Sequence, residues 1–291
     1  MTLSQLTYFK YVVDEMSLTK AAKKLFVTQS AISQQLSLLA AELDCQLFYR
    51  RSRTLHLTQE GEFIYGKAKK IIMQMEELTD ELNSRGENVV GRVKIGNGPI
   101  SSKKFLPDII SSVLKRYPKI SFSLFEIHSK NLVQAIIESR INLGLGQIDE
   151  EDERIHSEKL IVGRLILICS SQHKWSSLKS VSLRDLRKIK LIHRVREVET
   201  SHLFKILEPD TGRNFQLEAM NTETIVPYIK RNMGMALAPD YVIDLMAPEG
   251  ISKIELEEKI CIPWGIFWDK YRPVSKAAQI FIDTLKENLP Y

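Results

Sequence analysis

Two helix-capping residues lie eleven positions apart near the start of the chain, and this spacing limits the fold more than any other feature. Ser17 precedes a short helical pattern that carries Ala21 and Ala22, and Thr28 precedes a longer one over about 29–43. Ser and Thr are favoured helix N-caps. An earlier helix is predicted from apolar residues at helical spacing, namely Leu6, Phe9, Val13 and Met16. Three helices joined in this way predict a helix-turn-helix.

The helix predicted over 29–43 has one apolar and one polar face. Its apolar residues are Ile32, Leu36, Leu39 and Leu43. Its polar residues are Gln29, Ser30, Ser33, Gln34 and Gln35. Glutamine both donates and accepts hydrogen bonds at base edges in the major groove, and serine fits either role. Asp44 follows where a left-handed residue would end the helix. The pattern therefore indicates a DNA recognition helix, although a solvated helix face is the alternative.

Basic residues flank this helix and favour DNA over the solvated face. The segment "LFYRRSRTLHLTQEG" alternates in polarity and holds three arginines, which predicts a two-stranded wing. A net charge of +5 permits a polyanionic partner, and Lys and Arg side chains neutralise phosphates. The predicted DNA contacts are Lys20, Lys23, Lys24, Thr28, Gln29, Ser30, Ser33, Gln34, Gln35, Arg50, Arg51 and Arg53.

A long helix is predicted over 60–88, with Gly86 at its end. Its apolar residues follow a 4-3-4-3-4 spacing, which is typical of a coiled-coil seam. They are Ile64, Ala68, Ile71, Met75, Leu78 and Leu82. Such a stripe packs on its own domain or on a second copy of the chain. The narrow, uninterrupted stripe favours self-association.

From Arg92 onwards the pattern alternates between strands and helices, which predicts two βα lobes with parallel sheets and a cleft between them. Residues 164–171 and 261–270 are expected to cross between the lobes, and a final helix over 275–289 to return to the first. Ser101 is expected to cap a helix that runs to Tyr117. Pro227 falls within a predicted helix and should kink it or shift its start.

A ligand is expected beyond the carboxyl ends of the strands, close to helix N-termini. The loops concerned are "GNGPISS", "GQID", "HRVREVETS" and "MNTET". Capping alone would also explain their hydroxyl residues. Glu199 and Glu223 are nearby, so the charge of the ligand stays open. The predicted effector contacts are Ser101, Ser102, Gln147, Arg194, Arg196, Thr200, Ser201, Asn221 and Thr222.

The segment "LTKAAKKLFVTQSAISQQLSLLAAELDCQLFYRRSRTLHLTQEGE" resembles the winged helix-turn-helix of LysR-type transcriptional regulators, and the order of elements matches along the whole chain. The resemblance implies an α/β fold with an N-terminal winged helix-turn-helix (1–59), a dimerising linker helix (60–90) and a two-lobed periplasmic-binding-protein-like effector domain. Its first lobe would comprise 91–164 and 267–291, and its second 165–266.

This resemblance also implies a set of partners. They are operator DNA with dyad symmetry, a small metabolite, and further copies of the chain in a dimer or tetramer. RNA polymerase is a further candidate. The sequence departs from the family pattern at three positions. Ser30 stands where proline is frequent, Gln34 where arginine is frequent and Asp44 where glycine is frequent. The change at Gln34 bears on base preference.

No motif in the chain indicates catalysis, a metal or a cofactor. The six histidines are scattered, and there is no HExxH, P-loop, G-x-S-x-G or dinucleotide fingerprint. The first fifteen residues lack a signal-peptide layout, and no apolar run spans a bilayer, so we expect a cytoplasmic protein without membrane partners. Two alternatives stay open: a redox-sensing regulator that uses Cys169 and Cys261, and a cytoplasmic solute-binding protein without DNA function.

Overall fold

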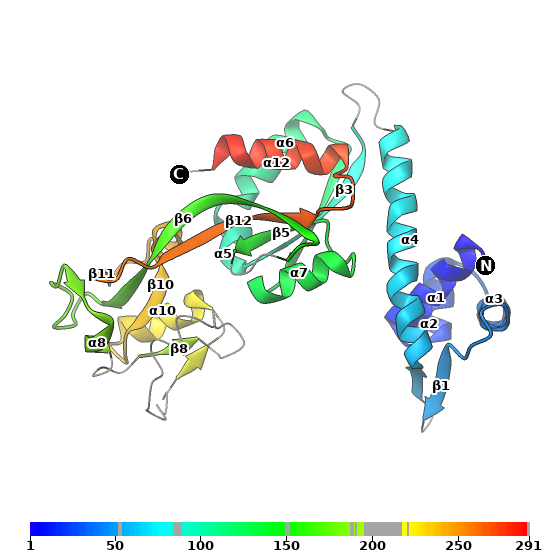
Figure 1. Ribbon diagram of the computed structural model, residues 1–291, viewed down its shortest axis with the longest axis horizontal. Helices are drawn as coiled ribbons and strands as arrows, with labels where there is room; N and C mark the ends of the chain where they lie inside the picture. Colours follow the sequence, from blue (N-terminus) through cyan, green and yellow to red (C-terminus); the bar gives the residue numbers. More distant parts are fainter. Residues whose placement is uncertain are drawn as a thin grey trace. The chain divides into compact units, whose positions relative to one another are not determined.

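The computed structural model describes residues 1–51, 54–83, 89–148, 152–186, 189, 191–194, 217–219 and 221–289. Its contacts divide the chain into two compact units, Met1–Gly91 and Arg92–Tyr291. The first unit consists of helices and one β-hairpin, and the second of a curled sheet with helices on its faces (Figure 1). No helix within the described ranges combines the length and the apolar character that a bilayer crossing requires.

The first unit is a winged helix-turn-helix followed by a long helix. Its elements are α1 (Leu3–Glu15), α2 (Leu18–Leu25), α3 (Gln29–Glu42), β1 (Phe48–Arg51), β2 (Thr54–Leu57) and α4 (Gln59–Asn83). The Ser17 hydroxyl accepts a hydrogen bond from the Lys20 N–H at 3.3 Å, and the Thr28 hydroxyl accepts one from Ala31 at 3.2 Å. Asp44 has φ 47°. Both predicted caps and the left-handed residue after α3 are therefore confirmed.

The core of this unit contains the apolar faces of α1 and α3. Phe9, Ile32 and Leu39 are completely buried. Met16, predicted on the same face, is instead exposed. It is the C-cap of α1 with φ 44°, because the helix ends one residue earlier. Antiparallel pairing of β1 with β2 forms the predicted wing. Gly86, the predicted end of α4, lies outside the described residues.

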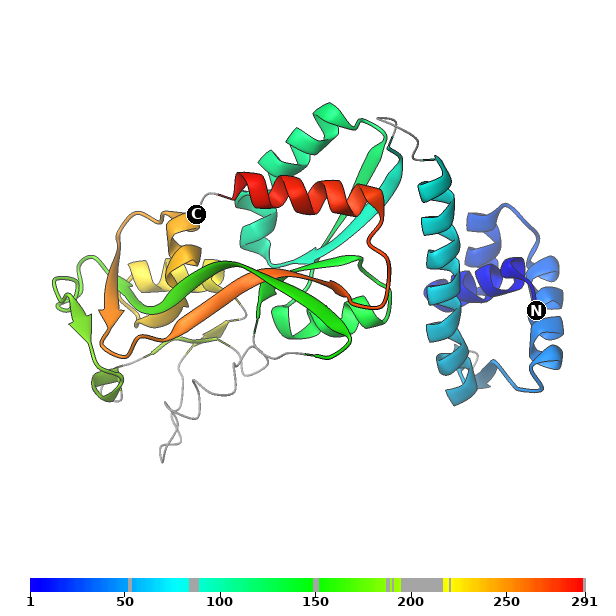
Figure 2. The same cartoon turned by 45° about the horizontal axis from the view of Figure 1, so that its top comes forward.

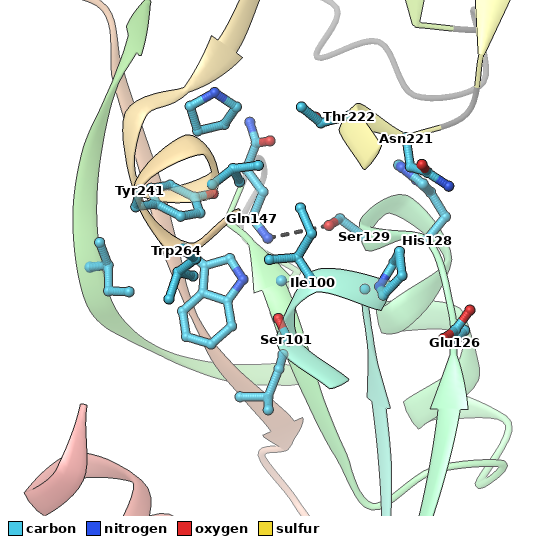
Figure 3. A pocket seen from close by; sticks show the side chains of 18 of the residues that line it. Ile100, Ser101, Glu126, His128, Ser129, Gln147, Asn221, Thr222, Tyr241 and Trp264 are labelled. Carbon is cyan, nitrogen blue, oxygen red and sulfur yellow. Dashed lines mark hydrogen bonds between the residues drawn. The ribbon is translucent and has the colours of Figure 1, made fainter. Parts of the chain in front are cut away.

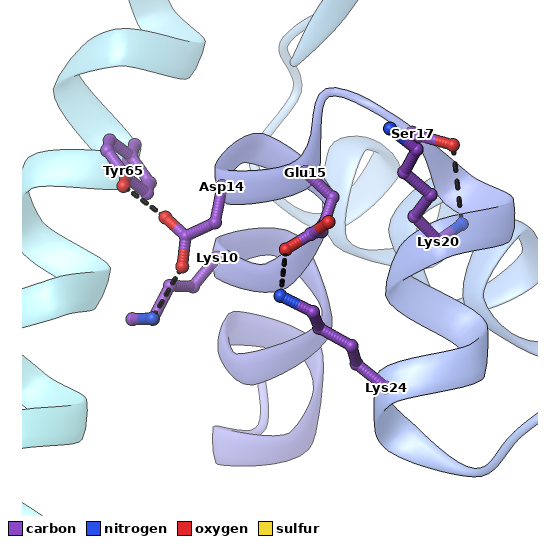
Figure 4. Close-up of polar contacts among 7 residues, drawn as sticks. All are labelled: Lys10, Asp14, Glu15, Ser17, Lys20, Lys24 and Tyr65. Atoms are coloured by element: carbon purple, nitrogen blue, oxygen red, sulfur yellow. Dashed lines mark hydrogen bonds and ion pairs between the residues drawn. The ribbon is translucent and has the colours of Figure 1, made fainter.

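Polar contacts join α1 to α2 and to α4 (Figure 4). The Tyr65 hydroxyl of α4 donates to the carboxylate of Asp14, which also accepts from Lys10 Nζ at 2.6 Å. Lys24 of α2 donates to Glu15, and this hydrogen bond, together with the charge of Glu15, raises the pKa of the Lys24 ammonium. The C-terminal end of α1 is therefore linked by side-chain contacts to both α2 and α4.

The second unit contains the remaining elements. Its strands are β3 (Gly91–Asn97), β4 (Ile120–Glu126), β5 (Leu143–Gln147), β6 (Ile155–Ser170), β7 (Ser180–Val181), β8 (His193–Arg194), β9 (Glu218–Ala219), β10 (Ala236–Pro239), β11 (Ile251–Leu256) and β12 (Cys261–Asp269). Its helices are α5 (Pro99–Lys104), α6 (Leu106–Arg116), α7 (Ser129–Ile137), α8 (Leu183–Leu186), α10 (Thr222–Lys230), α11 (Asp240–Met246) and α12 (Lys276–Asn288).

Two lobes share one sheet of order β4-β3-β5-β12-β6-β11-β7, with β10 also paired to β6. The first lobe holds β3 to β5 with α5 to α7, and the second holds β7 to β11 with α8, α10 and α11. Strands β6 and β12 run through both (Figure 2). Helix α12 packs on α6, so the chain returns to the first lobe as predicted.

The sheet is mixed, not parallel as the alternating pattern predicted. Strand β3 pairs in parallel with β5, and β11 with β7. In contrast, β12 runs antiparallel to both β5 and β6, and β10 and β11 run antiparallel to β6. The βα repeats account for the parallel pairs. The crossing strands reverse direction and therefore form the antiparallel ones.

Two predictions about prolines and caps need correction or comment. Ser101 does not cap a helix; Gly98 is the N-cap of α5, and Pro99 is at its first turn, where a missing N–H is tolerated. The predicted helix to Tyr117 is interrupted at Phe105, because Pro107 has no N–H to continue the ladder. Pro227 lies inside α10, which still begins at Thr222.

Replacing either of two glycines in α4 by alanine should change the stability of the first unit, in opposite directions. A Cβ at Gly61 would lie 2.2 Å from the Leu47 carbonyl oxygen and 2.9 Å from Leu57 Cδ2, whereas a Cβ at Gly66 meets nothing within 4 Å. We expect Gly61→Ala to destabilise the unit by about 1–3 kcal/mol through overpacking. Gly66→Ala should stabilise it by about 0.5–1 kcal/mol through helix propensity. Urea unfolding of both variants measures the signs, and a stabilising Gly61→Ala would contradict the described contact between α4 and the wing.

Candidate functional site

The polar face of α3 is open to solvent as the sequence predicted. Gln29, Ser30, Ser33 and Gln34 are exposed, and Gln35 is half-buried. On the opposite side Ile32 and Leu39 are fully buried, so the helix cannot rotate to hide its amides. Five side chains able to donate and accept hydrogen bonds thus occupy the outer face of a short, capped helix. This is the arrangement that a major-groove reading helix requires.

Basic residues lie beside this helix, although their availability differs. Lys20 and Lys23 are exposed on α2. Lys24 is also exposed, but it forms an ion pair with Glu15, so part of its charge is already neutralised within the chain. The backbones of Arg50 and Arg51 lie on β1 of the wing, opposite Leu55 and Thr54. Their side chains, and the whole of Arg53, lie outside what the structure describes.

The predicted apolar seam of α4 divides into two parts. Ile64 and Ala68 pack against the core of the winged helix, together with Tyr65 and Ile72, which were not predicted. The second part stays exposed, at 37% to 63%, and comprises Ile71, Met75, Leu78 and Leu82. The first half of the seam therefore joins α4 to its own unit. The second half leaves an apolar stripe on the surface, which we call the α4 stripe.

A cavity of about 240 Å³ lies between the two lobes of the second unit. Figure 3 shows that both lobes contribute polar side chains to it, among them Ser101 of α5 and Ser129 of α7 from the first lobe and Thr222 of α10 from the second. Among the described lining residues there is no lysine or arginine. The lining consists of Gly98, Pro99, Ile100, Ser101, Phe105, Glu126, Ile127, His128, Ser129, Leu145, Gly146, Gln147, Ile161, Asn221, Thr222, Pro239, Tyr241, Val242, Leu245 and Trp264.

Two residues with hydroxyl side chains line this cavity from opposite lobes. Ser101 of α5 is 6% exposed and Thr222 of α10 is 5% exposed. Among the described residues, no group forms a hydrogen bond with either side chain. A hydroxyl in a cavity that has no protein partner is free to form a hydrogen bond with a water or a ligand. Both hydroxyls are therefore positioned to bind a molecule in the cavity.

The other predicted effector residues have different places. Gln147 lines the cavity, and its backbone N–H donates to the Ser129 hydroxyl at 3.3 Å. Asn221 also lines it, but its side-chain oxygen caps α10 by accepting from Thr224 at 2.9 Å. Ser102 does not line the cavity, because it hydrogen bonds to the buried side chain of Asn97 at 2.8 Å.

Four predicted effector residues cannot be placed in the cavity. Arg194 lies on β8, but the position of its side chain is outside what the structure describes. Arg196, Thr200 and Ser201 fall within 195–216, which also lies outside the described ranges.

Several lining residues were missed by the sequence analysis. Ser129 is the first residue of α7 and follows the end of β4 by three residues. The expectation that a ligand lies beyond strand ends, close to helix N-termini, would therefore have found it. His128 precedes it and lines the cavity as well. Tyr241 and Trp264 supply much of the aromatic lining. Trp264 stacks edge-on against Phe105 at 5.3 Å, and no local pattern marks either residue.

One ion pair joins the lobes beside the cavity. Lys103 Nζ of α5 lies 3.0 Å from a carboxylate oxygen of Glu223 on α10. The hydrogen bond to Glu223, together with its charge, raises the pKa of the Lys103 ammonium. From the sequence, Glu223 was one of the two acidic residues that left the charge of the ligand open. In this conformation it is engaged by Lys103.

The positions of Cys169 and Cys261 do not support a disulfide between them. Cys261 of β12 pairs with Arg164 of β6, and Cys169 is five residues further along β6, opposite Ser252. Five residues of strand separate positions by roughly 16 Å, whereas disulfides need Cα atoms within about 7 Å. Burial also raises the pKa of the Cys169 thiol, which disfavours the reactive thiolate.

Comparison with known proteins matches both units to one family. The family model for the LysR substrate binding domain matches residues 86–290. The family model for bacterial regulatory helix-turn-helix proteins of the lysR family matches residues 3–62. Together they account for nearly the whole chain, and the second covers every residue predicted to contact DNA.

Full-length relatives share this organisation. YwbI of Bacillus subtilis, an uncharacterized HTH-type transcriptional regulator, is 29% identical over 294 residues, with 99% of this chain and 97% of YwbI covered. The structure of full-length BenM, a transcriptional regulator of Acinetobacter baylyi, is 27% identical with a TM-score of 0.58, covering 99% of this chain and 96% of BenM.

A second structure, full-length CbnR in complex with its target DNA, is 19% identical with a TM-score of 0.67, and the match covers 99% of each chain. At this identity the likeness shows the fold alone. The two family models and the full-length relatives agree with the observed fold. The chain belongs to the LysR family of DNA-binding transcriptional regulators.

Proposed function

We propose that this regulator recognises a specific operator through α3 and the wing, and that a small molecule in the cavity between the lobes modulates this binding. The observation that carries the proposal is that Ser101 and Thr222, two buried residues whose hydroxyls have no hydrogen-bond partner among the described residues, line one cavity from different lobes. Regulation of this kind needs no catalytic step. Its place of action would be the cytoplasm, with operator DNA and, as a further candidate partner, RNA polymerase.

The proposed division of labour follows the chain. Residues 1–59 would read DNA, residues 60–90 would join two copies, and residues 91–291 would bind the effector. The lobes would comprise 91–164 with 267–291, and 165–266. The exposed α4 stripe supports the second assignment, because an uncovered row of large apolar side chains on a helix is suited to pairing with a copy of itself.

The cavity favours a compact organic effector with an apolar body and a polar end. Trp264, Tyr241 and Phe105 offer flat apolar surface. The polar end would lie between Ser101 and Thr222, where hydroxyls can donate or accept. A molecule that contacts both lobes binds best at one separation of the lobes. Its binding energy can therefore be coupled to the conformation that the DNA-binding units adopt.

Gln34→Ala tests base reading by α3. Loss of the amide should reduce discrimination at one base-pair position by about 1–3 kcal/mol. Arg51→Ala provides the contrast, because losing a phosphate contact should weaken all duplexes alike and flatten the salt dependence of binding. Binding of both variants to duplexes selected by the wild-type protein from a random-sequence pool measures the difference. Equal binding of selected and scrambled duplexes by the wild-type protein would contradict specific recognition.

Ile71→Glu together with Leu78→Glu tests self-association through the α4 stripe. Both residues are exposed in the single chain, so the substitutions should leave the fold intact while burying unpaired charge in a pair of helices. Light scattering should then detect monomers, and operator affinity should fall because two half-sites no longer share one body. Glu at the exposed Leu178 is a control outside the stripe. A double variant that remains dimeric would rule out this interface.

Ser101→Ala and Thr222→Val test the effector site. A thermal-shift screen of small metabolites would first identify a compound that raises the melting temperature. Loss of each hydroxyl should then weaken the binding of that compound by about 0.5–1.5 kcal/mol, since one hydrogen bond is removed. Calorimetric titration measures this change. DNA binding without the compound should stay unchanged.

Ser102→Ala is the matched control for these two variants. It adjoins Ser101 but hydrogen bonds to Asn97, so it should affect stability and leave compound affinity as in the wild type. Unchanged affinity in both Ser101→Ala and Thr222→Val would place the effector elsewhere. Reduced DNA binding without compound would instead make the two hydroxyls structural.

A further inference from the structure

Phe26 occupies the turn between α2 and α3, and its ring has almost no contact with the rest of the chain. It is 95% exposed, ahead of Tyr271 at 75% and Phe63 at 66% among the large apolar residues that the structure describes. An aromatic ring left in water forgoes the hydrophobic stabilisation that drives folding. The ring therefore contributes little to the core of the first unit.

The backbone of Phe26 is also unfavourable for this residue type. It is the C-cap of α2 in the left-handed conformation, with φ 56° and ψ 39°. Its N–H bonds to the carbonyls of Ala22 and Lys23, which closes the helix. Glycine and asparagine adopt this conformation with less strain than an aromatic residue. Another residue at this position, such as glycine or asparagine, would thus give a more stable fold. Residues that cost stability in this way concentrate at functional positions.

The neighbours of Phe26 indicate what the ring meets. Lys23 and Lys24 form the last turn of α2, and Thr28 and Gln29 begin α3. In a helix-turn-helix, the N-terminal end of the second helix enters the major groove and the first helix crosses the backbone. The turn between them therefore lies at the edge of the groove. The lysines suit a polyanion and oppose contact with the same basic surface of a second copy.

We propose that Phe26 is a DNA-contacting residue whose ring packs against the apolar surface of the duplex at the edge of the major groove. Two groups supply such surface there, the thymine methyl group and the deoxyribose ring, and phenylalanine is a known partner of the thymine methyl. The proposal rests on the placement of α3 in the major groove. Because an apolar contact displaces no counterions, it adds affinity without adding salt dependence.

Phe26→Asn is the decisive variant, because it removes the ring while keeping a residue that tolerates the left-handed turn. The probe is a duplex selected by the wild-type protein from a random-sequence pool, titrated over a series of salt concentrations. Affinity should fall about tenfold, equivalent to about 1.4 kcal/mol. The slope of log affinity against log salt should match the wild type, and the melting temperature should be equal or higher. Phe26→Leu should retain most of the affinity, since its apolar side chain remains.

Lys23→Ala is the electrostatic comparison. If Lys23 contacts a phosphate, this variant should flatten the salt slope by about 0.9, whereas Phe26→Asn should not change it. The same duplex with uracil in place of thymine separates the two apolar groups. Loss of the Phe26→Asn effect on that duplex assigns the contact to a thymine methyl, and persistence of the effect assigns it to deoxyribose.

A folded Phe26→Asn variant that binds as tightly as the wild type at every salt concentration would overturn the proposal. So would a change in its salt slope equal to that of Lys23→Ala, because the ring would then act through the neighbouring cations. If the wild-type protein selects no duplex, the placement of α3 in the major groove fails first. That result is distinct from a failure of the Phe26 contact alone.

Discussion

The antiparallel pairing of β6 with β12 is the constraint on which the second unit depends. Nine residue pairs connect the two strands, from Cys261 opposite Arg164 to Asp269 opposite Ile155. The register shifts between Trp264 and Gly265, where a Cβ on Gly265 would lie 2.0 Å from the Glu158 carbonyl oxygen. Only glycine allows this approach. Strands from both lobes pair with these two, so one ladder fixes the sheet that the lobes share, whereas β8 and β9 form a separate two-stranded sheet.

The shared ladder also explains how residues distant in sequence come to line one cavity. Ile161 of β6 and Trp264 of β12 face each other in the register and both line it. Helices α5 and α10, one from each lobe, then bring Ser101 and Thr222 to the same space. The Lys103–Glu223 ion pair connects these two helices directly. It is exposed on the lysine side, so it adds little stability and leaves the lobes able to move when a ligand binds.

Local signals predicted the first unit well and the cavity only in part. The caps at Ser17 and Thr28 and the left-handed Asp44 depend on neighbouring residues, so the sequence alone was sufficient to locate them. Met16 was misplaced because an apolar residue at helical spacing can equally end a helix. Trp264 was missed because only the pairing of distant strands brings it to the cavity. Tyr241 lies in the first turn of α11, directly after β10. Pro107 indicates the start of a new helix, because proline is favoured in the first turn. The regular apolar spacing up to Tyr117 nevertheless led to the prediction of one continuous helix.

The division of the α4 seam shows why one sequence pattern can serve two purposes. Ala68 is buried against the winged-helix core, and Tyr65 donates a hydrogen bond to Asp14 of α1. The first half of α4 is thus fixed to the helices that present α3. The α4 stripe continues along the same helix, whose 25 residues are continuous. A partner bound to the stripe would therefore hold α3 at a set distance and orientation, because a continuous helix transmits position with little bending. Strict spacing of two half-sites requires such rigidity. A flexible joint between stripe and winged helix would instead tolerate variable spacing.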